Sequence, residues 1–226
     1  MVGSRRDPPE RRHRTTRAPP ANWYICTSMA ATTPTRDRPR GAARREALLD
    51  AVLRVVAEVG VDAVTHRRVA EVAGLPLAST TYWFQSREHL LMAALDRAAD
   101  RDIERLRGFL GETPERAADP LGLAVDAILD PSEHSSQTRG WLLATYALML
   151  EAARRPALRE VTTRWTEAYL EALGPLFAAA GSRHPRPDAE LLLAAADGLT
   201  VEQLASDDDS NLAPRLRRLA AALVRA

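Results

Sequence analysis

The sequence predicts an all-α fold with two domains, and three observations lead to this prediction. From Gly41 onward, apolar residues recur at three- and four-residue steps, which is the spacing of a helix with one buried face. Proline and glycine divide this part of the chain into segments of helical length. A chain of 226 residues with 46% hydrophobic content can bury one small and one larger helical domain. We expect a three-helix domain over residues 41–86 and a larger helical domain over residues 87–226.

Residues 1–40 differ from the rest of the chain in composition and charge. They carry nine arginines against three acidic residues and contain six prolines, with few apolar residues and no helical period. Such a segment cannot bury enough apolar surface to fold, so we predict a disordered basic tail that adds non-specific attraction to phosphate. Residues 41–100 carry seven arginines against eight acids, so the surplus of positive charge lies in the tail.

The first ordered helix is predicted from Gly41 to Val59. Its apolar residues form one stripe, and we interpret this stripe as packing surface within the small domain. The residues of the stripe are Leu48, Val52, Val55, Val56 and Val59. Gly60 follows and is expected to end the helix.

Residues 64–91 have the order of a helix-turn-helix. Thr65 can cap a short helix because its hydroxyl accepts an unpaired amide of the first turn. Gly74 tolerates the left-handed conformation that ends this helix, and Pro76 can open the next one. Ser86 is a second expected cap, for the longer helix that follows.

The second helix of this motif, residues 77–84, has an inner and an outer side. Thr80 and Phe84 lie one turn apart and are expected to face inward. The outer side consists of Leu77, Ser79, Thr81 and Trp83. Small and hydroxylated side chains suit base edges and phosphates, which a helix-turn-helix contacts when its second helix lies in a DNA major groove.

Residues 44–91 resemble the tetracycline-repressor-like (TetR) family of bacterial transcription regulators without a gap. The matching positions are Thr65, Ala70, Gly74-Leu75, Tyr82-Trp83-Phe84, Arg87 and Leu90-Leu91. Trp83 stands where a histidine is common, and Pro76 replaces the usual hydroxyl cap of the recognition helix. Met29 precedes a stretch that looks like an ordinary start for the family. Residues 1–28 are therefore either a native basic arm or translated upstream sequence that the native protein lacks.

The resemblance implies a set of DNA contacts. Contacts to the phosphate backbone are implied for His66, Arg67 and Arg87, at helix starts that attract phosphate themselves. Arg68 either joins them or pairs with a neighbouring glutamate on the protein surface. Residues 77–81 would read bases, and the two aromatic residues that follow either contact the backbone or pack inside. The expected DNA-binding residues are Thr65, His66, Arg67, Arg68, Leu77, Ala78, Ser79, Thr81, Tyr82, Trp83 and Arg87.

Beyond residue 102 the chain keeps helical character without a fixed motif. Helices are predicted near 87–109, 120–129, 136–154, 157–180, 188–205 and 213–225. The third of these is apolar around most of its surface, so we interpret it as the central buried helix of the domain. Aromatic faces with polar tips on it and on the next helix indicate a small-molecule effector site, although plain core shows the same spacing. The candidate effector residues are Phe109, His134, Trp141, Tyr146, Met149, Glu151, Trp165, Tyr169 and Phe177.

The last two helices each carry small and apolar residues on one face, which allows close approach of another helix. Family members form a homodimer through a bundle of four such helices, and the resemblance implies the same arrangement here. The alternative is that these faces cap their own domain. In a dimer, recognition helices about 34 to 36 Å apart would read a near-palindrome in successive major grooves. The candidate interface residues are Leu192, Ala195, Ala196, Leu199, Leu216, Leu219, Ala220 and Leu223.

Other classes of function find little support in the sequence. It has no glycine-rich phosphate loop, no HExxH or cysteine-rich metal set, and five histidines without ligand spacing. We therefore expect no catalytic residues, no metal and no cofactor. A single cysteine, Cys26, and the lack of a signal peptide or membrane-spanning apolar run predict a soluble cytoplasmic protein without an internal disulfide.

The predicted function is a homodimeric regulator that binds double-stranded DNA at a near-palindromic operator, as a repressor released by a small-molecule effector. An activator is also compatible with groove docking. A net charge of minus one over residues 41–100 leaves open a helical ligand-binding or protein-interaction module that no longer binds DNA. A helical enzyme with an unrecognised pocket is the remaining alternative.

Overall fold

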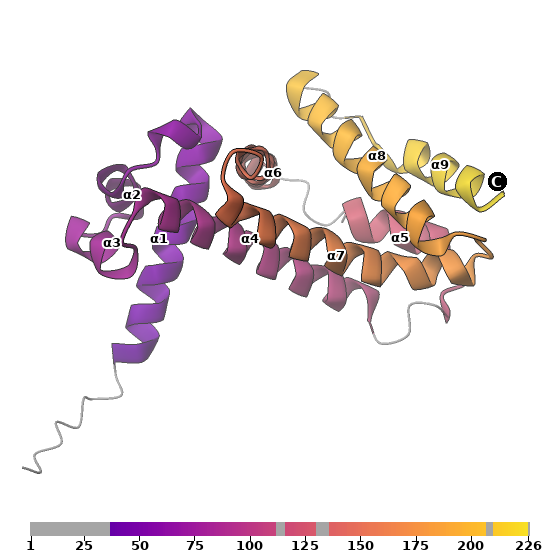
Figure 1. Ribbon diagram of the computed structural model, residues 1–226, viewed down its shortest axis with the longest axis horizontal. Helices are drawn as coiled ribbons and strands as arrows, with labels where there is room; N and C mark the ends of the chain where they lie inside the picture. The colour runs from indigo at the N-terminus through magenta and orange to yellow at the C-terminus, as the bar shows by residue number, and fades with distance from the viewer. Residues whose placement is uncertain (1–36, 112–115, 130–135, 207–209, 226) are drawn as a thin grey trace, which may run out of the picture. The chain divides into compact units, whose positions relative to one another are not determined.

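The computed structural model describes residues 37–111, 116–129, 136–206 and 210–225. Every regular element in these ranges is helical, which confirms the predicted fold class (Figure 1). From Pro39 onward the chain forms one compact unit. The elements are α1 (Asp37–Val59), the 3₁₀ helix η1 (Val61–Ala63), α2 (His66–Ala73), α3 (Leu77–Trp83), α4 (Arg87–Leu110), α5 (Pro120–Leu129), α6 (Ser136–Glu151), α7 (Pro156–Ala179), α8 (Pro185–Ser206) and α9 (Ala213–Arg225).

The ends of the short helices are fixed by the capping residues that the sequence predicts. The hydroxyl of Thr65 accepts a hydrogen bond from the amide of Arg68 at 3.1 Å, and the hydroxyl of Ser86 accepts one from His89 at 3.1 Å. Gly74 ends α2 with φ of 65°, a left-handed conformation in which an L side chain is strained. These contacts confirm the predicted turn between α2 and α3.

The small domain is assembled around the apolar side of α1. Leu48, Val52 and Val55 are fully buried and belong to the same core as Phe84 of the segment after α3. Arg54 of α1 also donates to the backbone carbonyl of Val72 at 3.3 Å. Figure 1 shows α1, α2 and α3 gathered at one end of α4, so this long helix connects them to the rest of the chain.

The central helix of the larger domain is α7. It packs chiefly against α4 and α8, while α5 packs against α9 and α7 (Figure 1). The prediction that α6 is the central buried helix is wrong, because Leu143 and Leu150 of α6 are 37% and 75% exposed. An apolar surface on all sides shows only that a helix can be buried, and it does not say which neighbours are available to cover it.

Three helix ends differ from the predicted positions by three residues or more, and each lies near a proline. α1 begins at Asp37 instead of residue 41, and α8 begins at Pro185 instead of residue 188. The amides of a first helical turn need no partner within the helix, so proline is tolerated there. α6 ends at Glu151, before the predicted residue 154, ahead of the proline that opens α7. Among the described helices, none is long and apolar enough to cross a membrane.

Candidate functional site

The outer side of α3 is exposed, and its inner side is anchored. Leu77 is 50% exposed and Tyr82 is 78% exposed, and Ala78 and Thr81 are also exposed. Thr80, in contrast, has no exposed surface. The predicted inner side is confirmed at Thr80, and the predicted outer side is confirmed at Leu77 and Thr81, whereas Ser79 is half-buried. Leu77, Ala78, Thr81 and Tyr82 are the side chains of α3 that are exposed to a partner.

The hydroxyl of Thr80 holds α3 in place. It donates to the carbonyl of Leu77 at 2.8 Å and lies 3.5 Å from the carbonyl of His66 at the start of α2. Phe84, one turn later, is 1% exposed. A buried hydroxyl that is hydrogen-bonded in this way avoids the cost of an unpaired polar group, and it fixes the position of α3 relative to α2.

Trp83 does not lie outside as predicted. It is half-buried and packs against the apolar core, and its ring atom Cζ2 would lie 3.7 Å from a Cβ added to Gly41 of α1. Its neighbour Tyr82 meets it edge to face, with ring centroids 5.0 Å apart. Periodicity within seven residues does not place a side chain at the end of a helix, where α1 approaches Trp83 near Gly41.

The basic residues near α2 and α3 differ in the number of hydrogen bonds and ion pairs that they make within the protein. Arg67 is exposed and makes no hydrogen bond or ion pair with any described residue. Arg68 pairs with Glu71 at 3.4 Å, which is the surface alternative that the sequence left open. In His66 the ring atom Nδ1 is buried without a partner, so only Nε2 can reach a phosphate.

Arg87 is bound to the connection before α2. Its guanidinium donates to the carbonyls of Val61 at 2.7 Å and Val64 at 3.0 Å, and lies 3.3 Å from a carboxylate oxygen of Asp62. The side chain is 32% exposed. Arg87 therefore stabilises the small domain, and its contact with phosphate remains a prediction.

Two arginines form ion pairs that link α1, α4 and α7. Arg97 of α4 forms ion pairs with Glu46 and Asp50 of α1, the second at 2.7 Å. Arg164 of α7 forms ion pairs with Asp96 at 2.7 Å and Asp100 at 2.6 Å, both on α4. Charged contacts thus run from α7 through α4 to α1.

A buried polar cluster lies between α4 and α7. Asp102 accepts hydrogen bonds from the indole of Trp165 at 2.8 Å, the hydroxyl of Tyr169 at 2.7 Å and the guanidinium of Arg105 at 2.9 Å. Asp102 is 6% exposed, and Trp165 and Tyr169 are each 7% exposed. Burial and then the charge of Asp102 raise the pKa of the Tyr169 hydroxyl, so it remains a neutral donor.

Helices α6 and α8 extend this cluster. The ring of Trp141 on α6 meets that of Trp165 edge to face at 6.2 Å, and the hydroxyl of Tyr146 donates to Asp197 of α8 at 2.9 Å. Burial, followed by the charge of Asp197 and more weakly that of Asp102, raises the pKa of Tyr146. Four of the predicted effector residues therefore share one region, which we call the aromatic cluster: Trp141, Tyr146, Trp165 and Tyr169, with Asp102, Arg105 and Asp197.

The other predicted effector residues do not gather in the same way. Phe109 is 39% exposed at the end of α4, and Phe177 is fully buried two turns beyond Tyr169. Glu151 is held by Arg154 and Arg155 of the connection between α6 and α7, and the hydrogen bond from Arg155 lowers its pKa. Met149 is half-buried on α6. His134 lies outside the described residues.

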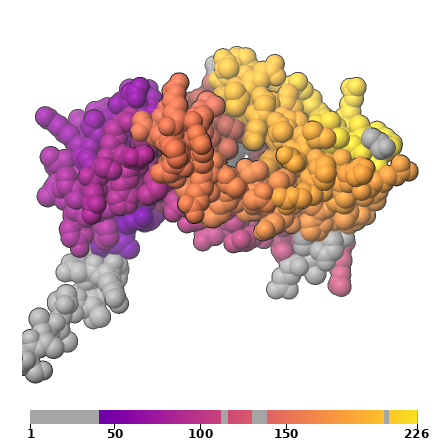
Figure 2. Space-filling model, in the orientation of Figure 1, coloured from indigo at the N-terminus to yellow at the C-terminus, as the bar shows by residue number. Residues whose placement is uncertain are grey.

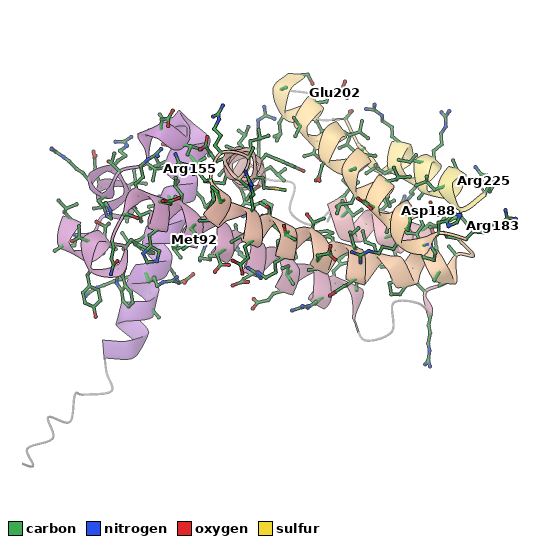
Figure 3. All side chains as sticks on the ribbon, in the orientation of Figure 1. Met92, Arg155, Arg183, Asp188, Glu202 and Arg225 are labelled. Atoms are coloured by element: carbon green, nitrogen blue, oxygen red, sulfur yellow. The ribbon has the colours of Figure 1, made fainter. Side chains whose placement is uncertain are left out.

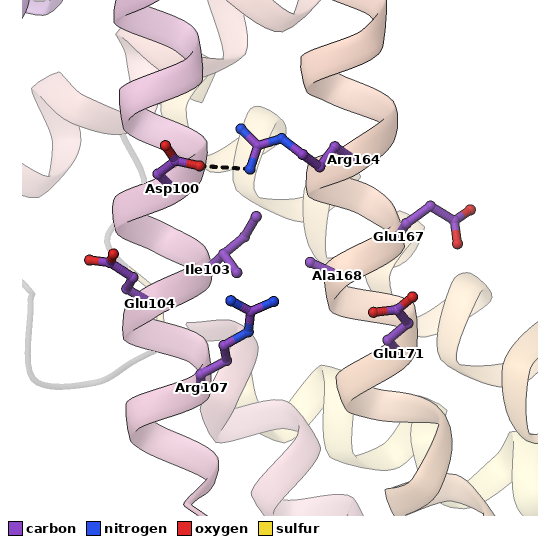
Figure 4. Close-up of a pocket in the computed structure, with 8 residues that line it drawn as sticks. All are labelled: Asp100, Ile103, Glu104, Arg107, Arg164, Glu167, Ala168 and Glu171. Atoms are coloured by element: carbon purple, nitrogen blue, oxygen red, sulfur yellow. Dashed lines mark hydrogen bonds and ion pairs between the residues drawn. The ribbon is translucent and has the colours of Figure 1, made fainter.

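A separate groove of about 250 Å³ runs between the outer faces of α4 and α7 (Figure 4). Its charged lining residues are Asp100, Glu104, Arg107, Arg164, Glu167 and Glu171. Figure 4 shows the ion pair between Asp100 and Arg164 closing one end of the groove. An open groove with a charged lining is a poor site for an apolar effector, so the aromatic cluster remains the better candidate.

The predicted interface residues divide into two sets. The more buried set is part of the chain's own core and cannot contact a partner, because each side chain is at most 1% exposed: Leu192, Ala196, Leu216 and Ala220. The other set is half-buried and stays a prediction: Ala195, Leu199, Leu219 and Leu223. The exposed face of α8 is different, and consists of Leu191, Ala194, Gly198, Val201 and Ala205.

Comparison with known proteins decides the family. Residues 112–226, about half of the chain, match the family model described as the tetracyclin repressor-like C-terminal domain. The chain belongs to the TetR family. This TetR chain carries the helix-turn-helix of that family before the matched domain, and its relatives are transcriptional regulators and not enzymes.

Solved structures and curated proteins agree with the assignment. The TetR chain is 31% identical to the transcriptional regulator SCO7518 of Streptomyces coelicolor A3(2), with a TM-score of 0.62 over 81% of this chain and 99% of that one. EbrR, described as a multidrug binding protein and solved with imidazole, is also 31% identical, with a TM-score of 0.62 over 86% of this chain and 95% of that one. The repressor KstR of Rhodococcus jostii (strain RHA1) is 34% identical over 103 residues, 45% of this chain and 49% of KstR. The TetR chain thus spans about half the length of that curated relative.

Sequence analysis missed the charged members of the aromatic cluster. Asp102 could have been found, because it lies one turn after Ala98 and Ala99 and one turn before Leu106, on the apolar side of α4. A charged residue on an apolar side is a signal of a buried polar contact. Asp197 gives a weaker signal, because its hydrogen-bond partner among the described residues, Tyr146, is distant in sequence.

Proposed function

We propose that this chain is a homodimeric transcriptional regulator that binds a near-palindromic DNA operator and is released from it by a small-molecule effector. The observation that carries this proposal is the exposed outer side of α3, with Leu77, Thr81 and Tyr82 held outward by the buried Thr80. Membership of the TetR family supports it. Binding to a chromosomal operator would place the protein in the cytoplasm.

On DNA, α3 would lie in the major groove. Leu77 and the methyl group of Thr81 can contact thymine methyls, and exposed hydroxyls can bond bases or phosphates. Arg67 is available for a phosphate because the described part of the protein gives it no other partner. The amino-terminal end of α2 attracts the same anion through its unpaired amides. Backbone contacts of this kind would fix the register in which α3 reads the sequence.

The exposed face of α8 is proposed as the dimer surface. Leu191 is 55% exposed and Val201 is 46% exposed, and the small residues between them allow a second helix to approach closely. Figure 3 shows Glu202 near the end of α8 and Arg225 at the end of α9; both are exposed, and neither has an ion pair with a described residue. An exposed stripe of apolar and small residues suits association with a second copy, as the family implies.

Release follows if the effector favours a state that does not fit DNA. The effector can lower DNA affinity only by its own difference in affinity between the two states. The aromatic cluster touches α4 through Asp102, and α4 holds α1 through Arg97. A ligand in the cluster therefore has a direct structural connection to the small domain.

Selection of bound fragments from genomic DNA tests the proposal. Selected fragments should share a near-palindrome, and the substitutions Leu77→Ala and Thr81→Ala should change the preferred bases within it. Arg183→Ala is a matched control, because Arg183 is an exposed arginine before α8 and should leave DNA binding unchanged. Recovery of no enriched sequence at low salt would favour the alternative, a module that no longer binds DNA. A reporter gene under the selected operator would then separate a repressor from an activator.

A further inference from the structure

Asp197 is the one member of the aromatic cluster whose charge the described residues leave unbalanced. Its Oδ1 accepts a hydrogen bond from Tyr146 at 2.9 Å, and no described basic residue pairs with it. The second oxygen, Oδ2, has no partner and is not enclosed. Asp102 differs, because Arg105 pairs with it at 2.9 Å. The cluster therefore holds two carboxylates and one guanidinium.

The surroundings of Asp197 are suited to a ligand. Tyr146 lies beside it, with its hydroxyl 2.9 Å from Oδ1, and the charge of Asp102 also contributes, weakly, to the raised pKa of this tyrosine. Trp141, five residues before Tyr146 on α6, faces Trp165 in the interior. Figure 2 shows α6 and α8 as neighbours at the surface, and these helices carry Tyr146 and Asp197. Because Oδ2 of Asp197 is not enclosed, a polar group of a ligand can reach it.

We propose that the effector of this regulator is an organic cation, whose positive group pairs with Oδ2 of Asp197 and whose apolar part lies against the rings of Trp141 and Tyr146. This inference rests on the proposed function, because it names the class of molecule that the effector site would bind. Half-buried carboxylates strongly prefer a cationic partner, since a charge removed from water is stabilised only by an opposite charge or by hydrogen bonds. Aromatic faces attract the same cation through their negative π surface.

An anion or a neutral ligand fits this site less well. An anion would meet the unbalanced negative charge of Asp197 in a region of low dielectric, where like charges repel strongly. A neutral ligand without a donor would cover Oδ2 and leave this oxygen without a hydrogen bond. A cation brings the cluster to two positive and two negative charges, so it is the ligand class that this set of residues favours.

The test compares a cation with a neutral molecule of the same shape. Phenyltrimethylammonium and tert-butylbenzene differ by one nitrogen and one charge, and binding of each to the full chain is measured by isothermal titration calorimetry without DNA. We expect the cation to bind at least about tenfold more tightly than the neutral molecule. In Asp197→Asn, which keeps an acceptor for Tyr146, we expect that preference to be lost. Glu160→Gln is the matched control, since Glu160 is exposed on α7 and its change removes the same charge.

Three results would overturn the proposal: no binding of the cation up to millimolar concentration, equal binding of the neutral molecule, or an unchanged preference in Asp197→Asn. If that variant fails to fold by circular dichroism, the comparison of the two molecules on the native chain still decides. Operator binding is measured in parallel by band shift. Loss of cation binding with intact operator binding would contradict the cationic effector alone, whereas absence of operator binding would contradict the proposed function.

Discussion

Some basic side chains at the DNA-binding end stabilise the fold, and others are free to contact DNA. Arg87 is the clearest example of the first kind. We expect Arg87→Ala to lower the free energy of unfolding by about 1 to 3 kcal/mol, because the carbonyls of Val61 and Val64 lose a charged donor. Arg87→Lys keeps the positive charge but loses the planar guanidinium, which donates to both carbonyls at once. We expect this variant to lose most of the same free energy of unfolding as Arg87→Ala while it retains the salt dependence of DNA binding. Chemical denaturation and salt-dependent band shifts measure the two effects.

Arg67 is the matched comparison for Arg87. Since it has no partner among the described residues, Arg67→Ala should leave the free energy of unfolding within about 0.5 kcal/mol of the native value. It should weaken binding to all DNA sequences about equally and reduce the salt slope by about one unit. A loss confined to one base position would contradict a phosphate contact.

Asp197 makes the stability of the fold depend on pH. Burial raises the pKa of its carboxyl above the ordinary value of 3.8, so the folded chain holds this proton more tightly than the unfolded chain does. The contribution of Asp197 to stability is therefore lost as pH rises through the window between these two pKa values. Asp197→Asn removes the ionised form, and we expect the variant to be more stable than the native chain at neutral pH. The gain should vanish below pH 3.8, as measured by thermal unfolding across pH.

Residues whose roles depend on near neighbours could be predicted from the sequence. Thr65, Gly74 and Ser86 act through backbone groups within five positions, so their types and spacing were sufficient. Asp102 acts on Trp165, 63 positions away, and that contact depends on how α4 and α7 pack. Local spacing therefore predicted the caps and turn of the small domain. In the aromatic cluster it predicted the tryptophans and tyrosines but not Asp102, Arg105 and Asp197.

Between elements, the pairing of Arg97 with α1 is an ion-pair contact that joins the two domains. Arg97 is 18% exposed and meets two carboxylates, so we expect a double-mutant cycle of Arg97→Gln with Asp50→Asn to give a coupling of about 0.5 to 3 kcal/mol. Loss of Arg97 would also leave Glu46 and Asp50 to repel each other across one turn of α1. Denaturant unfolding of the two single variants and the double variant measures this coupling.

Arg154 and Glu151 provide a control cycle of the same chemistry. Arg154 is 82% exposed and lies 3.3 Å from Glu151, whose side chain is 16% exposed, and an ion pair with one side chain in solvent contributes about 0.2 to 1 kcal/mol. A coupling for Arg97 no larger than that of Arg154 would mean that α1 and α4 are held together by their apolar contacts alone.

The order of the helices followed from periodicity and from proline and glycine, but the orientation of each helix did not. α8 has apolar residues on two sides, so the pattern cannot say which side faces the core. Leu192 and Ala196 face inward, and Leu191 and Val201 face outward. The choice depends on the positions of α7 and α9, which pack against α8 from the inside. The starts of α1 and α8 were also predicted too late, beside Pro39 and Pro185. Proline can lie in the first turn of a helix, so it does not always mark the connection before the helix.

For the whole molecule, Gly198 offers a test of dimerisation that spares the single chain. A Cβ added at Gly198 meets nothing within 4 Å, so Gly198→Leu fits the isolated subunit and favours the helix. In a close helix pair the new side chain would hold the subunits apart. We expect the dimer dissociation constant to rise at least about tenfold, about 1.4 kcal/mol, as measured by sedimentation equilibrium. Affinity for a two-site operator should fall with it.

Gly108→Leu is the matched control for this change. Gly108 is an exposed glycine of α4 whose added Cβ also meets nothing within 4 Å. The control should leave the oligomeric state and DNA binding as they are. An unchanged dimer in Gly198→Leu would move the interface away from the exposed face of α8.

Helix α4 is continuous from Arg87 to Leu110, and it carries the attachments to η1, α1 and α7 at Arg87, Arg97 and Asp102. An α-helix advances 1.5 Å per residue and stretches little, so these attachments move as one body. Substitutions on α6, α7 and α8 can therefore alter which molecule is sensed while the same rod still transmits the response. Descendants of such a gene can diverge in chemical specificity without any compensating change in the helices that contact DNA.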